Sequence, residues 1–207
     1  HNTNCLVESF GSDNAPIDLQ NGSVDIGVMS EQMSDADKQN FKNVYGYEPL
    51  EIKAALDMIA VLVNAENPIN CMTIAELDGV YSNSNSCEGS TNINTWGELN
   101  LEGKWTNTTI NAYGRTPSSG TYDVFQKIAL CNGTYKKSIT ELASARDIVD
   151  FVSRDTSSIG YSGAGLLAPG VKTVAIGESK ENCYLPEPKH ATSKQYPLTR
   201  DLYLYLK

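Results

Sequence analysis

The chain contains only two histidines, His1 and His190, and no pair of cysteines in a C-x-x-C spacing. Structural zinc sites draw on clustered cysteines and histidines, so this scarcity argues against a zinc protein. Serine and cysteine nucleophiles usually need a histidine base, and these two histidines give no evident pairing. An enzyme is therefore the weakest interpretation, and no cofactor is expected.

Long apolar runs are also absent from the sequence. The most apolar segment, residues 58–63, is far shorter than the roughly 20 residues of a membrane-spanning helix, and it predicts a buried strand. The first residues, His1-Asn2-Thr3, do not form the basic and then apolar segment of a secretory signal. Any export signal is expected to have been removed or to lie outside this sequence.

Basic residues are scarce, since 16 lysines and arginines stand against 25 aspartates and glutamates, for a net charge of −9. Nucleic-acid binding depends on a basic surface, so no nucleic-acid partner is expected. The same net charge repels anions at long range, so an anion site must hold its ligand by close, directed hydrogen bonds. The acidic pair Asp35 and Asp37 is interpreted as exposed loop charge.

The sequence has 207 residues, of which 40% are hydrophobic, enough for one two-lobed unit or two small domains. Strands and helices alternate along it, which predicts an α/β fold with mixed or mostly parallel sheets. Trp96, Trp105, Tyr203 and Tyr205 are interpreted as packing residues. Strands are expected at residues 5–10, 24–29, 51–63, 110–113, 159–161, 171–176 and 202–206, and helices at residues 15–19, 73–80, 139–154 and from residue 122 onward.

Five cysteines favour an oxidising compartment. Cys71 and Cys87 are close enough to close a local loop, which leaves Cys131 with Cys183 as the natural second pair, although the sequence does not determine the connectivity. Cys5 is left over. It is either a free buried thiol or paired with a segment outside this sequence or with another chain.

Three N-glycosylation sequons begin at Asn21, Asn107 and Asn132. They are compatible with a secreted eukaryotic glycoprotein. A chain this rich in Asn, Ser and Thr should contain about three such triplets by chance, so they do not decide between a bacterial and a eukaryotic source.

The most informative stretch is Arg115-Thr116-Pro117-Ser118-Ser119-Gly120-Thr121. Apolar residues recur at helical spacing after it, which predicts a helix with Ser118 or Ser119 as its N-cap. The first turn of a helix presents N–H groups and partial positive charge, and Arg115 adds a planar fork that can grip two oxygens. The stretch predicts an oxyanion site, although an ordinary capped helix beside a surface arginine explains the same residues.

Five motifs in order resemble the phosphate-binding proteins of ABC-type importers, which have the periplasmic binding protein type II fold. Each motif is weak alone, but their order along nearly the whole chain favours the family and an anion-binding role for Arg115. The motifs are Gly11-Ser12 with residues 21–30 (NGSVDIGVMS), residues 73–82 (TIAELDGVYS) with Asn94-Thr95-Trp96, Arg115 with Ser119-Gly120-Thr121, Ile159-Gly160-Tyr161, and residues 196–203 (YPLTRDLY).

The resemblance implies two α/β lobes, joined by crossover strands, that close on an anion. The central lobe would comprise residues 64–158. The flanking lobe would comprise residues 1–63 and 159–207. The implied anion-binding residues are Arg115, Ser119, Gly120 and Thr121 from the central lobe and Ser12 and Ser30 from the flanking lobe.

Ser30 stands where some members of this family have an aspartate. Such a carboxylate accepts the proton of hydrogen phosphate and so rejects sulfate. Asp13 and Glu31 are the nearest substitutes, but each is interpreted as a solvated loop carboxylate. Phosphate is therefore expected over sulfate or molybdate on family grounds alone.

The family's usual first strand and helix, and the helices after its last motif, have no counterpart here. The flanking lobe would then be incomplete at both ends and would expose apolar surface. The chain is expected to be part of a longer protein. The alternatives are that another chain supplies the missing elements or that the protein is a pared-down relative.

The resemblance implies an extracytoplasmic solute-binding protein, periplasmic, cell-surface or secreted, that captures inorganic phosphate without catalysis. Its expected partner is an ABC-type permease. The alternative is a secreted structural or adhesive protein that reuses the fold without a ligand. Against it stand Arg115, Ser119, Gly120 and Thr121, because a purely structural protein has no physical need to keep these residues at this spacing.

Overall fold

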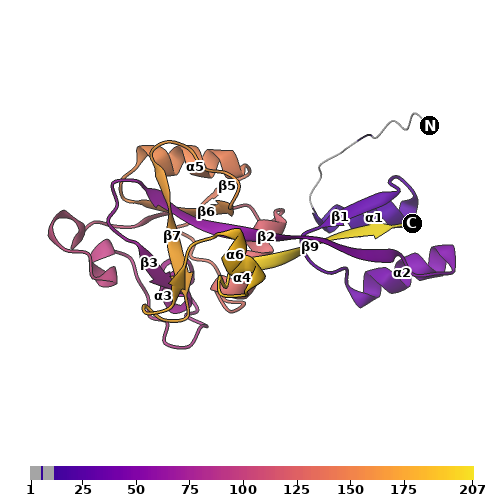
Figure 1. The fold of residues 1–207 in the computed structure, drawn as a ribbon, viewed down its shortest axis with the longest axis horizontal. Coiled ribbons are helices and arrows are strands. Elements are labelled where there is room, and N and C mark those ends of the chain that lie inside the picture. The colour runs from indigo at the N-terminus through magenta and orange to yellow at the C-terminus, as the bar shows by residue number, and fades with distance from the viewer. Residues whose placement is uncertain (1–5, 7–11) are drawn as a thin grey trace. The chain divides into compact units, whose positions relative to one another are not determined.

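The computed structural model describes residue 6 and residues 12–207, so Cys5 and nearly all of the strand predicted at residues 5–10 lie outside the described residues. The chain divides into two compact units (Figure 1). Unit 1 comprises His1–Ala55 and Asp201–Lys207, and unit 2 comprises Leu56–Arg200. Two strands, β2 (Leu50–Asn64) and β9 (Thr199–Leu206), run through both points of division.

Unit 1 packs two helices against a small sheet. The helices are α1 (Ala15–Asn21), which follows the 3-10 turn Ser12–Asn14, and α2 (Asp35–Tyr45). Strand β1 (Ile26–Met29) pairs antiparallel with β9, which neighbours β2. The helices bury Leu19 and Phe41 against Met29 and Tyr205 of the sheet. Helix α1, predicted at residues 15–19, ends at Gly22, which adopts the left-handed conformation common at helix C-termini.

Helix α2 corrects the interpretation of Asp35 and Asp37 as loop charge. Both aspartates lie in its first turn, where carboxylates interact favourably with the positive end of the helix dipole. Ser34 caps the helix, because its hydroxyl accepts a hydrogen bond from the Asp37 N–H at 3.1 Å. The helix was missed because its first six residues are polar apart from Ala36, so the apolar residues Phe41, Val44 and Tyr45 span only its last turn and a half.

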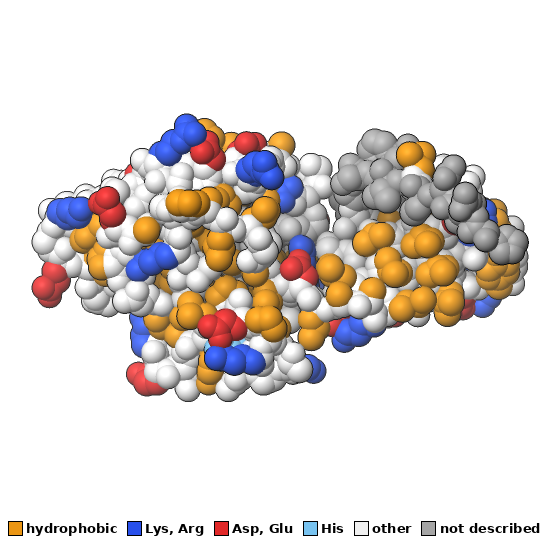
Figure 2. Space-filling model, turned by 45° about the horizontal axis from the view of Figure 1, so that its top comes forward, with side chains coloured by type: hydrophobic (Ala, Val, Ile, Leu, Met, Phe, Trp, Pro, Cys, Tyr) orange, Lys and Arg blue, Asp and Glu red, His pale blue; other side chains and the backbone are white. Residues whose placement is uncertain are grey.

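The sheet of unit 1 has an apolar surface on the face opposite its helices. Ile26 and Val28 alternate with the buried residues of β1 and are 51% and 60% exposed. On β2, Leu50 and Ile52 are 60% and 40% exposed. Figure 2 shows hydrophobic side chains gathered on this unit. Apolar surface of this kind was expected of an incomplete lobe.

Glu51, on β2 in unit 1, should make the stability of that unit depend on pH. Its carboxylate accepts hydrogen bonds from Lys38 Nζ at 2.7 Å, Tyr205 Oη at 2.8 Å and Gln32 Nε2 at 2.8 Å. The Lys38 bond, opposed by burial, lowers the pKa of this carboxyl below its ordinary value of 4.5. A lowered folded-state pKa stabilises unit 1 above pH 4.5, and this contribution is lost as the pH falls through the folded value.

We expect the Glu51→Gln variant to lose this contribution, so that its α2 amides exchange faster than wild type at pH 6, with a smaller difference at pH 3. Hydrogen exchange corrected for intrinsic rates measures the difference. Glu48→Gln is the control, because Glu48 pairs with Lys42 at the exposed surface and should change exchange less. An equal difference at both pH values would contradict the assignment to Glu51.

Unit 2 contains most of the secondary structure. Its elements, besides parts of β2 and β9, are β3 (Cys71–Thr73), α3 (Ile74–Tyr81), 3-10 helices at Trp96–Leu99 and Gly103–Trp105, β4 (Asn111–Arg115), α4 (Gly120–Ala129), β5 (Thr140–Leu142), α5 (Ala145–Arg154), β6 (Ser158–Gly163), β7 (Val171–Gly177), β8 (Cys183–Tyr184) and α6 (Pro188–Thr192).

The sheets of unit 2 are mixed. Strand β4 lies between β5 and β6 and is parallel to both. Strand β3 is parallel to β7, whereas β2 is antiparallel to β6 and β7, and β8 is antiparallel to β7. The predicted α/β class is confirmed. The predicted mixed sheets are confirmed as well, since β2 is antiparallel to β6 and β7 whereas β4 is parallel to both of its neighbours.

Strand β2 forms the centre of unit 2, as its apolar run predicted. Ile59, Val61 and Val63 face the main core, while Ala60 and Leu62 face α5, and all five are fully buried. A strand covered on both faces needs apolar residues at every position rather than at alternate ones. Figure 1 shows α5 on one side of this sheet and α3 and α4 on the other.

The units have different boundaries from the predicted lobes, residues 64–158 and residues 1–63 with 159–207. Residues 56–63 belong to unit 2 because they pair with β6 and β7 there. Residues 159–200 belong to unit 2, where β6 and β7 pair with β2 and β8 pairs with β7. The chain leaves unit 1 once, after Ala55, and returns at Asp201.

The helix predicted over residues 139–154 is shorter than expected. Residues 140–142 form β5, whose Leu142 lies opposite Arg115 of β4. Helix α5 begins only after Ser144, which caps it by accepting from the Arg146 N–H at 3.1 Å. Pairing with β4 overrides the local helical pattern. By contrast, α3 begins where predicted, with Thr73 and Glu76 forming a capping box.

Four cysteines form two disulfides, but with a different connectivity from the one favoured above. Cys71 pairs with Cys183 and Cys87 with Cys131, at Cα separations of 5.9 and 5.3 Å. Strand β7 explains the first pair, because β3 and β8 both pair with it and so bring Cys71 and Cys183 together. Closeness in sequence misled the prediction.

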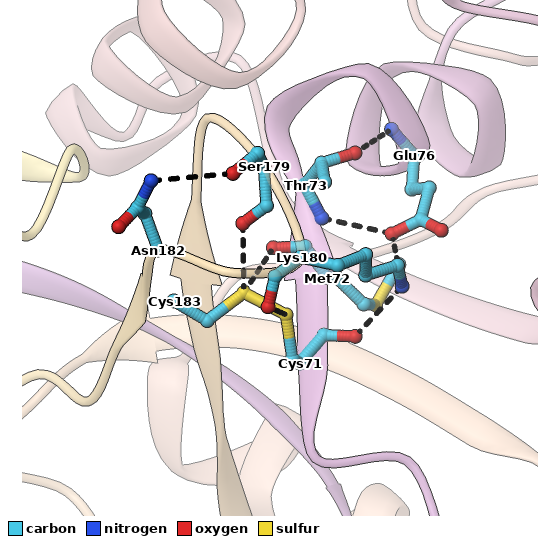
Figure 3. Close-up of a disulfide and its surroundings, with 8 residues drawn as sticks. All are labelled: Cys71, Met72, Thr73, Glu76, Ser179, Lys180, Asn182 and Cys183. Carbon is cyan, nitrogen blue, oxygen red and sulfur yellow. Dashed lines mark hydrogen bonds and ion pairs between the residues drawn. A yellow bond between two sulfur atoms is a disulfide. The ribbon is translucent and has the colours of Figure 1, made fainter.

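Figure 3 shows how the first disulfide is supported. Lys180, in the loop between β7 and β8, donates to the Cys71 carbonyl at 3.1 Å and forms an ion pair with Glu76 at 2.7 Å. Glu76 also closes the capping box of α3, so the disulfide, the loop and the helix start form one cluster.

The three sequon residues Asn21, Asn107 and Asn132 are exposed. Their glycosylation stays a prediction. Across the described part of the chain, the helices are all too short or too polar to cross a bilayer.

Candidate anion-binding site

Arg115 is the last residue of β4, and α4 begins five residues later at Gly120. Strand β4 is parallel to both its neighbours, and ligands of α/β proteins often bind beyond the carboxyl ends of such strands. Ser119, one of the two serines predicted to cap helix α4, is its N-cap. The fold therefore places the guanidinium and the helix start at the same edge of the sheet.

The first turn of α4 is organised around Ser119. Its hydroxyl accepts from the Thr121 N–H at 3.2 Å, and its carbonyl accepts from the N–H groups of Tyr122 and Asp123 at 2.7 and 3.4 Å. In the described residues no hydrogen bond is made by the Gly120 N–H. That amide is the donor of this turn that remains for a ligand, at the positive end of the helix dipole.

The Arg115 side chain is only partly used by the protein. Its Nη2 donates to the Ala143 carbonyl at 2.9 Å, but its Nε is buried without a hydrogen-bond partner among the described residues. Burial lowers the pKa of Arg115, and the positive charge of Arg200 acts in the same direction. An anion near Arg115 would satisfy the orphan donor and offset both effects.

A chain of tyrosine hydroxyls connects Arg115 to α4. The Arg115 N–H donates to Tyr161 Oη at 3.2 Å, Tyr161 and Tyr135 hydroxyls are 3.0 Å apart, and Tyr135 donates to the Tyr122 carbonyl at 3.1 Å. Because the Tyr135 hydroxyl donates its only proton to the Tyr122 carbonyl, the Tyr161 hydroxyl is the donor in the hydrogen bond between Tyr161 and Tyr135. Burial raises the pKa of Tyr161 to about 12, so it stays protonated at neutral pH.

Arg200 and Asp57 are site residues that the sequence interpretation missed. Arg200 donates from Nη1 to the Gly120 carbonyl at 3.1 Å and from Nη2 to Thr121 Oγ1 at 3.2 Å. Its Nε and Nη2 also donate to Asp57 Oδ2 at 3.0 and 2.8 Å. Two signals were available: a charged residue, Asp57, directly before the most apolar run, and an arginine inside the YPLTRDLY motif.

Ser12 and Ser30 lie together in unit 1. Their hydroxyl oxygens are 3.0 Å apart, and the Ser30 N–H donates to Ser12 Oγ at 3.1 Å. Ser30 is buried at 9% exposure, whereas Glu31 is exposed, as expected of a solvated carboxylate. The side chain of Asp13 lies outside the described residues. The assignment of Ser12 and Ser30 to the anion stays a prediction.

The chemistry available in unit 2 suits binding. Guanidinium, hydroxyl and amide groups are donors that hold an anion. Within the residues that the structure describes, no three His, Cys, Asp or Glu side chains are placed to hold a metal ion.

Comparison with known proteins places these residues in context. The phosphate-binding protein PstS of Pseudomonas aeruginosa is 34% identical over 206 residues, which cover 99% of this chain and 64% of that protein. Protein SphX of Synechococcus elongatus is 25% identical over 190 residues, covering 90% of this chain and 54% of that protein. The chain thus spans less than two thirds of the length of these relatives.

Solved structures share the fold. A phosphate transport receptor from Vibrio cholerae has a TM-score of 0.73 and 20% identity, covering 97% of this chain and 74% of that one. A putative phosphate transporter substrate-binding protein from Clostridium perfringens, solved with bound phosphate, has a TM-score of 0.72 and 22% identity, covering 96% and 72%. The sequence model of the family described as the PBP superfamily domain matches residues 1–207 of this chain. The resemblance found in the motifs is confirmed, and the chain belongs to the PBP superfamily.

Proposed function

We propose that this chain captures inorganic phosphate without catalysis. The observation that carries the proposal is the half-buried Arg115, whose Nε has no partner in the described part of the protein and whose strand leads directly into the start of α4. A buried unpaired donor is costly, and an oxyanion with several acceptor oxygens removes that cost. Ser119, Gly120 and Thr121 are proposed as ligands, with Ser12 and Ser30 as further donors.

The relatives support the choice of ligand and setting. Similar chains carry the name phosphate-binding protein, and the Clostridium neighbour was solved with phosphate bound. We therefore assign the chain an extracytoplasmic location and an ABC-type permease as the partner that receives the phosphate. Two disulfides agree with an oxidising compartment.

Isothermal titration calorimetry on the full native protein tests the proposal. We expect saturable binding of one phosphate per chain at neutral pH, with sulfate and molybdate unable to displace it. The net charge of −9 gives no long-range attraction for phosphate, so binding depends on hydrogen bonds at close range. Salt screens such short contacts little, so the affinity should change little between low and moderate salt.

Binding by sulfate as tight as by phosphate would contradict phosphate selectivity, and the absence of a carboxylate at Ser30 would explain it. No heat with any oxyanion would overturn the proposal. It would favour the structural or adhesive alternative, a protein that kept the loop but lost the ligand.

A further inference from the structure

Arg200 reaches the first turn of α4 from β9, almost 80 residues later in the sequence. Its side chain is only 12% exposed, and all three of its nitrogens have partners. Nε and Nη2 donate hydrogen bonds to Asp57. Nη1 donates to the Gly120 carbonyl, and Nη2 also donates to the Thr121 hydroxyl. Arg200 therefore differs from Arg115, whose Nε has no partner in the described chain. It is placed to support the site rather than to grip the ligand.

The contact with Thr121 fixes the direction of a hydroxyl group. A guanidinium can only donate, so Thr121 Oγ1 must be the acceptor in its 3.2 Å contact with Arg200 Nη2. The single hydroxyl proton of Thr121 must then point elsewhere. Nothing in the described residues accepts it, although Thr121 is only 7% exposed.

We infer that Arg200 is a positioning residue that makes the Thr121 hydroxyl a donor to the bound anion. This inference rests on the proposed function and adds to it the residue that sets the polarity of one ligand. Without Arg200, the hydroxyl of a threonine in a helix can turn to donate to the carbonyl four residues earlier. Its oxygen lone pairs would then face the anion and repel it.

Asp57 keeps Arg200 in this orientation. Because Nε and Nη2 both donate to Asp57 Oδ2, the guanidinium plane is held at two points and its remaining donors are directed at the turn. A lysine at position 200 would keep the positive charge but not the planar guanidinium, so it cannot donate hydrogen bonds to Asp57, Gly120 and Thr121 at the same time. This difference separates positioning from simple electrostatic attraction.

A double-mutant cycle on phosphate affinity tests the inference. The variants are Arg200→Lys, Thr121→Val and the two combined, each measured by calorimetry on the full native protein. We expect Arg200→Lys to weaken phosphate binding about tenfold, on the order of one hydrogen bond to a charged ligand. In the Thr121→Val background, the same change should weaken binding less than about threefold, since the hydroxyl on which it acts is gone.

Additive effects, with Arg200→Lys costing tenfold in both backgrounds, would overturn the inference and leave the proposed function standing. Failure of the wild type to bind phosphate would overturn the proposed function, and this inference with it. The matched control is Arg154→Lys, since Arg154 also pairs with an aspartate, Asp150, in unit 2 but at the exposed surface. It should leave the affinity unchanged.

Thermal unfolding of each variant separates positioning from loss of fold. If Arg200→Lys does not fold, Asp57→Asn replaces it in the cycle, because that change weakens the hold on Arg200 while retaining the guanidinium and an acceptor oxygen. We expect a smaller loss of affinity, again absent in the Thr121→Val background. Equal losses in both backgrounds would contradict the inference.

Discussion

Replacing Arg115 by alanine is expected to raise the phosphate dissociation constant by at least about 100-fold. A guanidinium fork makes two charge-assisted hydrogen bonds to an oxyanion, each contributing roughly 1.5 to 3 kcal/mol, and about 1.4 kcal/mol corresponds to a factor of ten. The loss should be larger than for any single hydroxyl of the loop. Calorimetry with phosphate on the purified variant measures it.

The same substitution should leave the protein folded. Arg115→Ala removes one hydrogen bond, from Nη2 to the Ala143 carbonyl, but also removes a half-buried cation with an unpaired Nε. These changes oppose each other, so the melting temperature should shift by less than about 4 °C. Arg154→Ala, which removes an exposed ion pair with Asp150, should change neither affinity nor melting temperature measurably. Affinity retained by Arg115→Ala would mean that phosphate binds elsewhere.

Replacing Trp96 by alanine is expected to have the largest effect on stability. Trp96 is fully buried, packs edge-to-face on Trp105 with ring centroids 6.3 Å apart, and donates from Nε1 to the Ser157 carbonyl at 2.9 Å. Truncating a buried tryptophan costs about 3 to 5 kcal/mol, while the Ser157 carbonyl keeps its hydrogen bond from the Asn111 N–H at 3.1 Å. For a domain of this size, that lowers the melting temperature by roughly 6 to 20 °C.

Thermal unfolding followed by Trp105 fluorescence measures the effect, because the chain has only two tryptophans and one remains in the variant. Phe151→Ala is the control, since Phe151 is equally aromatic but 47% exposed, and it should cost about 1 kcal/mol or less. A loss that small for Trp96→Ala would show that the segment around it unfolds without disturbing the core of unit 2. It would also contradict the packing role predicted for this residue.

The start of α4 could be predicted from the sequence because its signals are local. An arginine, a serine N-cap and a glycine stand within six residues of one another, and the capping rules do not depend on the rest of the fold. The helix predicted at residues 73–80 is likewise present as α3, which Thr73 caps. Trp96, Trp105 and Tyr205 are buried packing residues, as predicted.

The supporting residues could not be predicted in this way because their contacts are distant in the sequence. Asp57 and Arg200 are 143 residues apart, and Arg115 and Tyr161 are 46 apart. Nothing local marks either pair as neighbours. The folding of β2, β6 and β9 brings them together, so the second layer of the site becomes visible only with the fold.

The errors in the fold have the same origin. Residues 140–142 have a helical pattern but pair with β4, and the disulfides follow the pairing of β3, β7 and β8 rather than closeness along the chain. Tertiary pairing outweighed local preference in both cases. Where the signal lies within one segment, as in the apolar run of β2, the predicted buried strand was confirmed.

The ion pair between Asp57 and Arg200 also joins the two ends of unit 2, because that unit begins at Leu56 and ends at Arg200. Unit 2 is thus an insertion whose two ends meet, interrupting a smaller α/β unit between residues 55 and 201. Proteins with adjacent termini tolerate excision, transplantation and circular permutation. The insertion carries Arg115, α4, both disulfides and both tryptophans, so the loop proposed to bind the anion and the residues that support it form a module that can be moved between proteins as one piece.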